Sequence, residues 1–321
     1  MKLLASRLKI RHLRMVVAIV DEGNLVGAAK RLNMTQSAVT KALQEIEALT
    51  GSQLFDRTNR GVVPTIFGET LAEHARFIIT QLTHAEEHLA DLRDGTGVRN
   101  AIGTVLSASA ELLPTAIARL RRERPRIVIR IVEGTGDVLV PALRSGELDL
   151  VVGRLSEHRE RQDVIQETLL DDMACVVARR GHPLAEREKV VLADLIGWDW
   201  IMPPQETSLR RQIDIAFRLE GLEPPAHAVE SVSLLTNRGL LVNADYLGVL
   251  PVQAARREAA FGVMSILPVS LGATRRSIGI TTRANARLSP AAKELIETLR
   301  LVAAELTNAE SHPGLKDRQS E

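Results

Sequence analysis

Apolar residues in the first fifty positions recur at three- and four-residue steps, which is the period of an amphipathic α-helix. Residues 8–22 carry one such stripe, and Gly23 follows it in the position of a C-terminal helix glycine. Ala28, Ala29 and Leu32 mark one face of a second helix. The pattern therefore predicts two short helices that share a small core.

A third helix follows a break in the pattern at Asn33 and Met34, and Thr35 is a good N-cap for it. Its apolar positions, again at helical steps, are Ala38, Ala42, Leu43, Ile46 and Leu49. The side chains left facing outward are Gln36, Ser37, Thr40, Lys41 and Gln44. Residues 24–51 thus predict a helix-turn-helix whose second helix presents hydrogen-bonding and cationic groups.

The segment after Gly51 predicts a small wing. Residues 53–55 indicate a short strand, residues 56–61 a turn and residues 62–64 a return strand. Two cationic side chains, Arg57 and Arg60, lie near the predicted tip. With the wing included, we expect the helix-turn-helix module to span residues 1–65.

Residues 66–94 predict one long helix, capped by Thr65. Its apolar positions approach an unbroken heptad seam and are Phe67, Leu71, Ala75, Ile78, Leu82, Ala85, Leu89 and Leu92. Such a helix is about 45 Å long, and its single apolar stripe would stay in water without a partner. We interpret it as a linker and dimerisation helix. A helix packed on its own chain is the alternative.

The pattern changes to alternating strands and helices after a predicted hinge at residues 95–100. In order, it predicts strand 103–107, helix 112–124, strand 127–133, helix 137–146 and strand 148–153. This βαβαβ unit implies a parallel sheet. A β-branched stretch at 168–179 and a last helix at 289–306 extend the α/β pattern over residues 101–307. The polar residues 308–321 predict a disordered tail.

Net charge separates the two parts of the chain. The whole chain carries +1, but residues 1–68 hold ten Lys and Arg against five acidic residues, so residues 69–321 carry −4. A basic module on a mildly acidic body suits a polyanionic partner at one end of the chain. Aromatic residues total 2%, which argues against single-stranded nucleic acid bound by base stacking.

Cys175 is the single cysteine, so an intramolecular disulfide is impossible and a reducing compartment fits. We see no signal peptide and no run of about 18 apolar residues, and expect a cytoplasmic protein outside the membrane. Because Cys175 lies in the apolar run MACVVA, we interpret it as a small buried hydrophobe rather than a redox sensor. A Cys pair, a phosphate loop, a nucleophile elbow and metal-ligand spacing of the histidines are all missing. We therefore expect no catalytic residue, no metal and no cofactor.

The run AAKRLNMTQSAVTKALQEIEALTGSQLFDRTNRGVVPTIFGE resembles the N-terminal signature of LysR-type transcriptional regulators. The similarity is specific over residues 8–95. It is looser over residues 100–305, where GELDLVVGR and YLGVLP resemble the family's effector domain. Ser37 stands where the family usually has proline, and Asn24-Leu25 where Ser-Phe is usual.

The resemblance implies an N-terminal all-α winged helix-turn-helix with a long linker helix. It also implies a C-terminal α/β effector domain of two periplasmic-binding-protein-like subdomains, I at about 101–167 and 270–307 and II at about 168–269. A homodimeric or homotetrameric activator or repressor would bind dyad sites in double-stranded DNA, respond to a small-molecule co-inducer and contact RNA polymerase. A cytoplasmic small-molecule-binding protein or enzyme with a tethering helix-turn-helix is the alternative. The missing acid–base constellation counts against an enzyme.

A helix in the major groove must present donors and acceptors to base edges, and its N-terminal residues usually do so. Arginines and hydroxyls nearby can hold phosphates, or enter a narrow minor groove from the wing. A solvated surface is the alternative for each of these residues. The candidate base contacts are Gln36, Ser37, Thr40 and Lys41, and the candidate phosphate or minor-groove contacts are Arg31, Thr35, Arg57 and Arg60.

Ligands of open α/β sheets sit outside the carboxyl ends of the strands. The candidate effector residues there are Ser107, Ser109, Thr135 and Arg154 from subdomain I, and Pro204, Thr207, Ser231, Ser233 and Gly248 from subdomain II. Ser109 and Thr135 precede helix starts, where hydroxyls and backbone N–H groups favour a carboxylate, although N-capping explains them equally. Arg154 is either a cation for the ligand or a salt-bridged surface residue. We expect an organic acid or sugar acid, with a neutral sugar as the alternative.

Overall fold

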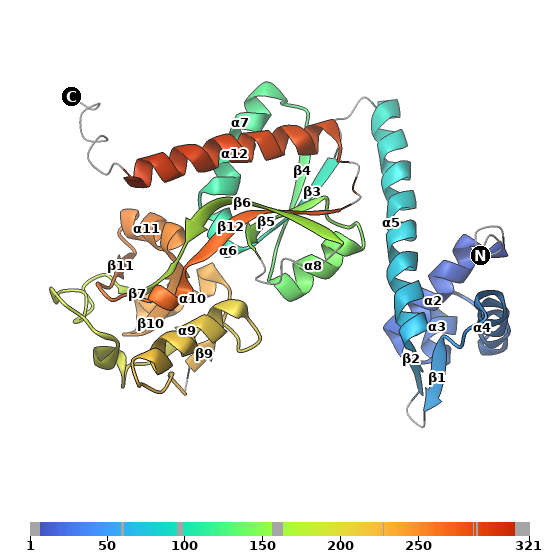
Figure 1. Ribbon diagram of the computed structural model, residues 1–321, viewed down its shortest axis with the longest axis horizontal. Helices are drawn as coiled ribbons and strands as arrows, with labels where there is room; N and C mark the ends of the chain where they lie inside the picture. Colours follow the sequence, from blue (N-terminus) through green and yellow to red (C-terminus); the bar gives the residue numbers. More distant parts are fainter. Residues whose placement is uncertain are drawn as a thin grey trace. The chain divides into compact units, whose positions relative to one another are not determined.

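The computed structural model of the chain (Figure 1) describes residues 7–58, 61–94, 99–155, 163–226, 228–284, 286 and 288–311, without the side chains of 87, 88, 90–94, 99 and 309–311. The chain divides into two compact units. One is formed by the chain up to Gly97 with Pro141–Leu148, the other by Val98–Val140 and Asp149–Glu321. Helices dominate the N-terminal unit, whereas the second unit contains two five-stranded sheets.

The N-terminal unit is built on α2 (Ile10–Glu22), α3 (Leu25–Arg31) and α4 (Gln36–Thr50). Gly23 ends α2 at a φ of 63°, a left-handed conformation that glycine adopts without steric cost. Polar side chains cap both of the following helices. At α3 the Asn24 side chain accepts from the Gly27 N–H (2.7 Å), and at α4 the Thr35 hydroxyl accepts from the Ala38 N–H (3.2 Å). The predicted helix-turn-helix is confirmed.

The wing consists of β1 (Phe55–Thr58) and β2 (Gly61–Pro64), which pair antiparallel. The predicted boundaries were wrong here, because 56–58 and 61 belong to the strands and not to the turn. Asp56 and Arg57 are exposed and polar, so their side chains resemble a turn while their backbone pairs in the ladder. The Val62 N–H donates to the Gly23 carbonyl (2.9 Å) and attaches the wing to the connection between α2 and α3.

Helix α5 (Ile66–Asp94) follows the wing and runs for 29 residues. Thr65 caps it by accepting from the Gly68 N–H (3.3 Å) and ties it to the wing by donating to the Gln53 carbonyl (2.7 Å). The core of the unit takes residues from α2, α3, α4, the wing and the first turns of α5, including Val16, Ile19, Ala28, Val39, Leu43, Ile46, Leu54 and Ala72. The helix-turn-helix and the start of α5 therefore share one core.

The first sheet of the second unit has the strand order β4-β3-β5-β12-β6. Its strands are β3 (Arg99–Thr104), β4 (Val128–Glu133), β5 (Leu150–Arg154), β6 (Val164–Asp172) and β12 (Arg276–Arg283). The predicted parallel pairing holds for β3 with β4 and for β3 with β5, while β12 runs antiparallel to both of its neighbours. The first strand was predicted too late, at 103–107, because the apolar residues Val105 and Leu106 continue the pattern into the next helix.

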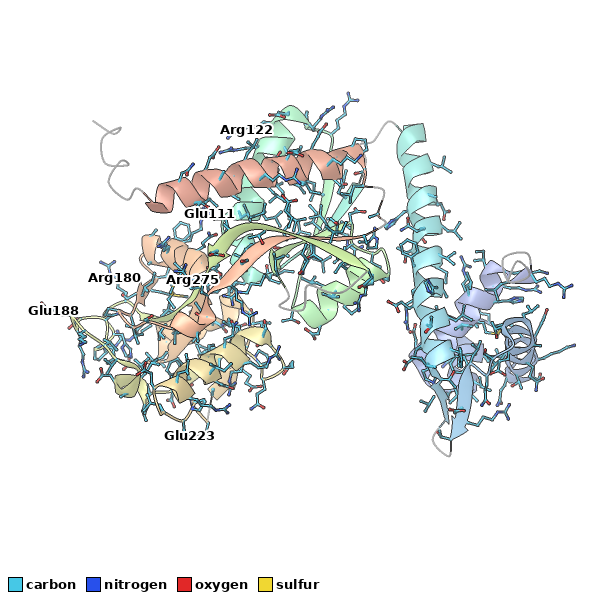
Figure 2. All side chains as sticks on the ribbon, viewed as in Figure 1. Glu111, Arg122, Arg180, Glu188, Glu223 and Arg275 are labelled. Carbon is cyan, nitrogen blue, oxygen red and sulfur yellow. The ribbon has the colours of Figure 1, made fainter. Side chains whose placement is uncertain are left out.

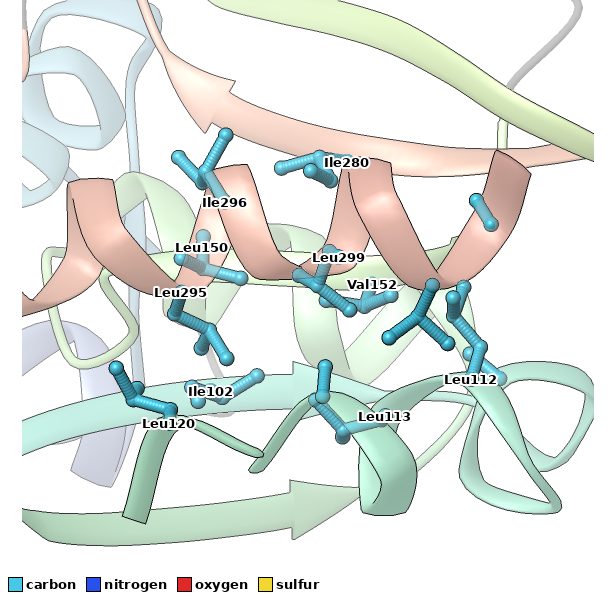
Figure 3. Packing of buried hydrophobic residues seen from close by; sticks show 14 of the residues in the cluster. Ile102, Leu112, Leu113, Leu120, Leu150, Val152, Ile280, Leu295, Ile296 and Leu299 are labelled. Atoms are coloured by element: carbon cyan, nitrogen blue, oxygen red, sulfur yellow. The ribbon is translucent and has the colours of Figure 1, made fainter. Parts of the chain in front are cut away.

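Helices α6 (Leu106–Ser109), α7 (Leu112–Glu123), α8 (Gly136–Arg144) and α12 (Pro290–Ser311) accompany this sheet. Leu113 of α7 and Leu299 of α12 pack into one core with Ile102 and Val152 of the strands (Figure 3). Helix α12 extends to Ser311, so residues 308–311 are helical and not part of a tail as predicted.

The second sheet has the order β11-β7-β10-β8-β9. Its strands are β7 (Ala174–Arg179), β8 (Trp200–Met202), β9 (Ala228–Glu230), β10 (Leu247–Pro251) and β11 (Met264–Ile266). The helices around it are η1 (Leu192–Leu195), α9 (Ser208–Leu219), α10 (Leu234–Asn243), α11 (Val252–Ala260) and η2 (Gly272–Thr274). Its core contains Trp200, stacked edge-on against Phe217 at 5.8 Å between ring centroids.

The chain passes between the two sheets at Met173 and again at Arg275. The β-branched stretch 168–179 is therefore two strands, each in a different sheet, which the continuous apolar pattern concealed. The chain thus changes sheet at residues 173 and 275, which lie after the predicted subdomain limits at 167 and 270. The Ala174 N–H donates to the Thr274 hydroxyl (3.0 Å), so the two passages are hydrogen-bonded to each other.

We predict that Leu299→Ala destabilises the second unit by about 2–5 kcal/mol, because Leu299 is fully buried in the α7–α12 core and its loss leaves a cavity. Leu301→Ala on the same helix is the matched control, since Leu301 is 62% exposed, and should change stability by less than about 0.5 kcal/mol. Urea denaturation followed by Trp fluorescence measures both. Equal losses for the two variants would contradict the assigned core.

Candidate functional site

The polar face of α4 is accessible along its N-terminal turns. Gln36, Ser37 and Lys41 are exposed and Thr40 is half-buried. The Thr40 hydroxyl donates to the Gln36 carbonyl (3.0 Å), one helical turn back. The Ser37 and Thr35 hydroxyls lie 3.1 Å apart. The Gln36 amide and the Lys41 ammonium remain available to a partner, as required of groups that read base edges.

Arg31 is held by acidic neighbours. Its guanidinium donates to Asp21 (2.8 Å) and lies 3.7 Å from Glu22, and Arg76 of α5 donates to the other oxygen of Asp21 (2.5 Å). Partial burial works to raise the pKa of Asp21, but the hydrogen bonds from Arg76 and Arg31 outweigh it and lower the pKa. A phosphate would therefore have to share Arg31 with Asp21.

The wing arginines differ from Arg31, for which the structure gives acidic partners. Arg57 is exposed and has no hydrogen-bond or ion-pair partner among the described residues. Arg60 lies outside the described residues.

A residue that the sequence did not single out is Glu47, whose carboxylate accepts from the buried Leu54 N–H (2.8 Å) and from the Phe55 N–H (3.4 Å). It ties α4 to the first strand of the wing, and a glutamate on a polar helix face gave no signal of this role.

The heptad residues of α5 fall into two groups. Ala75 is fully buried and Leu71 half-buried, so they pack within their own unit. The exposed members are Phe67 at 57%, Ile78 at 40%, Leu82 at 48%, Leu89 at 62% and Ala85. The side chain of Leu92 lies outside the described residues. The first turns of the helix thus pack on their own chain, and an apolar stripe further along is left exposed, so dimerisation through it stays a prediction.

The candidate effector residues of the first sheet lie near its carboxyl edge. Ser107 on α6 is 2% exposed, and its hydroxyl has no hydrogen-bond partner among the described residues. Ser109 donates to the Val105 carbonyl (3.1 Å), one helical turn back. Thr135 is half-buried, and its carbonyl accepts from the Val138 and Leu139 N–H groups at the start of α8.

The candidate residues of the second sheet serve mainly as caps. Thr207 accepts from the Arg210 N–H (3.2 Å) and donates to the Pro204 carbonyl (2.7 Å). Ser233 caps α10 by accepting from the Thr236 N–H (3.3 Å), and Ser231 accepts from the Ser233 N–H (3.1 Å). Gly248 is buried within β10. Capping accounts for Thr207 and Ser233 without any ligand.

Arg154 at the end of β5 belongs to a nearly buried polar cluster. Its side chain is 12% exposed and lies 3.4 Å from the carboxylate of Asp172, which is 1% exposed. The Gln212 amide of α9 lies between the guanidinium groups of Arg154 and Arg276. Burial lowers the pKa of Arg154, although the Asp172 carboxylate works to raise it. Arg154 is salt-bridged, as one alternative proposed, but it is not on the surface.

The cluster joins parts of the chain that are far apart in sequence. Asp172 ends β6 and Arg276 begins β12, next to the two passages between the sheets, while Gln212 comes from a helix of the second sheet. The cluster holds two guanidinium groups against one carboxylate. The spacing of these residues in the sequence gave no sign that they meet.

Cys175 is buried, and its sulfur lies 3.7 Å from the Leu250 carbonyl oxygen. Burial raises the pKa of the thiol to about 12, so it stays protonated at neutral pH. In the described part of the chain, no three His, Cys, Asp or Glu side chains are grouped to hold a metal ion. None of the helices described is long and apolar enough to cross a bilayer.

Charged side chains of both signs cover the outside of the second unit (Figure 2), where Arg122 of α7 and Arg180 and Glu188 of the segment after β7 are exposed. Residues 1–68, which include the helix-turn-helix and the wing, differ because they carry a surplus of five positive charges. This basic segment is thus the one suited to a nucleic acid.

Comparison with known proteins agrees with this arrangement. The family model "LysR substrate binding domain" matches residues 94–304, and "Bacterial regulatory helix-turn-helix protein, lysR family" matches residues 10–69. The HTH-type transcriptional regulator GbpR of Azospirillum brasilense is 34% identical over 298 residues, 92% of this chain and 87% of that protein.

Solved structures share the fold. Full-length OxyR from Pseudomonas aeruginosa superposes with a TM-score of 0.59 at 25% identity, over 92% of this chain and 98% of that one. Full-length CbnR complexed with target DNA gives a TM-score of 0.62 at 19% identity, over 92% of this chain and 100% of that one. These relatives are regulators and not enzymes. The chain belongs to the LysR family of bacterial transcriptional regulators, which bind DNA as oligomers and respond to small-molecule effectors.

Proposed function

We propose that this regulator reads a dyad-symmetric operator through paired α4 helices. We also propose that an organic anion bound beside Arg154 changes how the regulator binds this operator. The observation that supports the first part best is the exposed polar face of α4, where the Gln36 and Lys41 side chains have no partner among the described residues and the opposite face is buried. Gln36, Ser37, Thr40 and Lys41 contact base edges, while Thr35, Arg31, Arg57 and Arg60 contact phosphates or a minor groove. DNA in the cytoplasm is the target.

Pairing of the α4 helices requires a dimer, and the exposed stripe of α5 supplies the contact. Ile78, Leu82, Ala85 and Leu89 lie three or four residues apart, which suits a helix–helix seam, and Phe67 lies eleven residues before Ile78. Burial of such side chains is worth about 1.5–3 kcal/mol each. Dimer or tetramer formation then places half-sites about one helical turn apart, and the assembled protein contacts RNA polymerase at the promoter.

An organic anion is favoured for the effector because the cluster around Arg154 holds two guanidinium groups and one carboxylate. A carboxylate ligand could accept hydrogen bonds from a guanidinium group and be attracted by its charge. The buried Ser107 hydroxyl at the same edge of the first sheet can donate to such a ligand. Because Arg154 belongs to a strand of the first sheet and Gln212 to a helix beside the second, a ligand between them would alter how the two sheets close on each other.

Footprinting of the chain's own upstream region with and without candidate carboxylates tests the proposal as a whole. We expect a protected dyad whose extent changes when the effector is added. A footprint that stays unchanged with a carboxylate shown by calorimetry to bind would contradict the switch.

For DNA reading, Gln36→Ala should weaken binding to a duplex selected by the wild-type protein about tenfold or more, with little change on an unrelated duplex, because a bidentate base contact is lost. Arg57→Ala should weaken both duplexes alike and lower the slope of log K against log salt by about one. Fluorescence anisotropy at several salt concentrations measures both. Equal losses on the two duplexes for Gln36→Ala would exclude base reading by this residue.

For dimerisation, the double variant Leu82→Asp/Leu89→Asp should dissociate into monomers at micromolar concentration, because two carboxylates cannot be buried in an apolar seam. Thr83→Asp is the control, since Thr83 is exposed on a neighbouring face of the same helix. Analytical ultracentrifugation measures the mass of each. An unchanged mass for the double variant would show that this stripe of α5 is not the interface.

For the effector, carboxylates should raise the Tm of the wild-type protein and leave that of Arg154→Gln/Asp172→Asn unchanged, because the cation that binds them is lost. The double substitution keeps the pair neutral and so avoids a lone buried carboxylate. Thermal shifts with a panel of organic acids, sugar acids and neutral sugars measure this. A neutral sugar that stabilises both proteins equally would replace the anion in this proposal.

A further inference from the structure

The last turn of α2 carries charge of the sign that a helix C-terminus disfavours. Asp21 and Glu22 are the final two residues of this helix, and its last turn contains no basic residue. Because the C-terminal end of the helix dipole is negative, two carboxylates there are destabilising unless cations from other elements come close. These carboxylates therefore require partners from elsewhere in the unit.

Two arginines supply those cations, and both bond to the same carboxylate. Arg31, the last residue of α3, donates to one oxygen of Asp21 (2.8 Å) and lies 3.7 Å from Glu22. Arg76 of α5 donates to the other oxygen of Asp21 (2.5 Å). The side chains of Asp21, Arg31 and Arg76 are 30%, 48% and 37% exposed, so an anion from solvent can reach this group. One carboxylate thus divides its two oxygens between the helix-turn-helix and α5.

Arg31 has a second potential partner in a bound duplex. It precedes the turn to α4 and lies five residues before Gln36 in the chain. A phosphate oxygen accepts from a guanidinium group as a carboxylate oxygen does. Ion pairs between side chains as exposed as these are weak, so a phosphate can displace Asp21 from Arg31. Asp21 and a DNA phosphate are therefore alternative partners of the same cation.

We propose that Asp21 is a positioning residue for DNA binding, which competes with the phosphate backbone for Arg31 to a degree that Arg76 sets. This role rests on the phosphate contact of Arg31 proposed above. While Arg76 holds one oxygen of Asp21, it offsets part of the negative charge that attracts Arg31. Without Arg76, the carboxylate retains Arg31 more firmly and DNA binds less well. A residue of α5 thereby adjusts a contact that α3 makes.

The test uses the full-length protein and a duplex selected from a random library by the wild-type protein, with fluorescence anisotropy at several salt concentrations. Asp21→Asn should tighten binding about two- to fivefold, because Arg31 loses its competing carboxylate. Arg31→Gln should weaken binding and lower the slope of log K against log salt by about one. With Arg31→Gln already present, Asp21→Asn should give no further change, because it acts through Arg31.

Arg76→Gln tests the same competition from α5, and it serves alone if Asp21→Asn does not fold. It should weaken binding about twofold, and it should have no effect once Asp21→Asn is present. Two controls separate this competition from a general change of charge. Glu73→Gln removes a negative charge from an exposed position of α5, and Asp21→Glu keeps the charge, so both should bind like wild type.

Weaker or unchanged binding of Asp21→Asn would overturn the proposed competition, since the carboxylate would then hold Arg31 in place for DNA or have no influence on it. A gain that persists with Arg31→Gln, or that Glu73→Gln reproduces, would overturn it as a long-range effect of charge. Arg31→Gln that binds like wild type would instead remove the phosphate contact itself. Failure of the competition is thus distinct from failure of the contact on which it rests.

Discussion

The buried side of α4 governs the DNA-binding unit. Val39, Leu43 and Ile46 are at most 6% exposed and pack against α2 and α3, so the helix has one orientation in which its apolar surface leaves water. Burial of each such side chain is worth about 1.5–3 kcal/mol, far more than any single polar contact on the other side. Because the residues of a helix are fixed in angle to one another, this burial also directs Gln36 and Gln44 outward.

In the second unit, the comparable constraint is that the chain crosses twice between the two sheets. At both passages, Met173 and Arg275, a strand of one sheet gives way to an element of the other, and the Ala174–Thr274 hydrogen bond joins them. Polar residues collect beside this place, where neither core can cover them completely. Arg154, Asp172 and Gln212 meet there, so residues of the first sheet and of a helix beside the second sheet share one polar cluster.

Much of the fold could be predicted, because local signals and long-range packing agree in it. Thr35 and Thr65 cap the helices that the sequence assigned to them. The predicted strand boundaries were wrong where the pattern of side chains differs from the hydrogen bonding of the backbone. Asp56 and Arg57 look like a turn but pair in a strand, and the apolar run through 168–179 continues across two sheets. The exposure of Gln36 and Lys41 could be predicted from the sequence, because it depends only on the helical periodicity of the apolar residues around them.

The sequence by itself determined the helix-turn-helix, the caps, the heptad spacing of α5 and the family, since each depends on residues that are near one another in the chain. Only the tertiary structure decided which polar groups are engaged. It joined Arg31 to Asp21 and Arg76, Glu47 to the wing, and Arg154 to Asp172 and Gln212. Periodicity tells which side of an element is buried, but not what it is buried against, and such contacts depend on how distant segments pack.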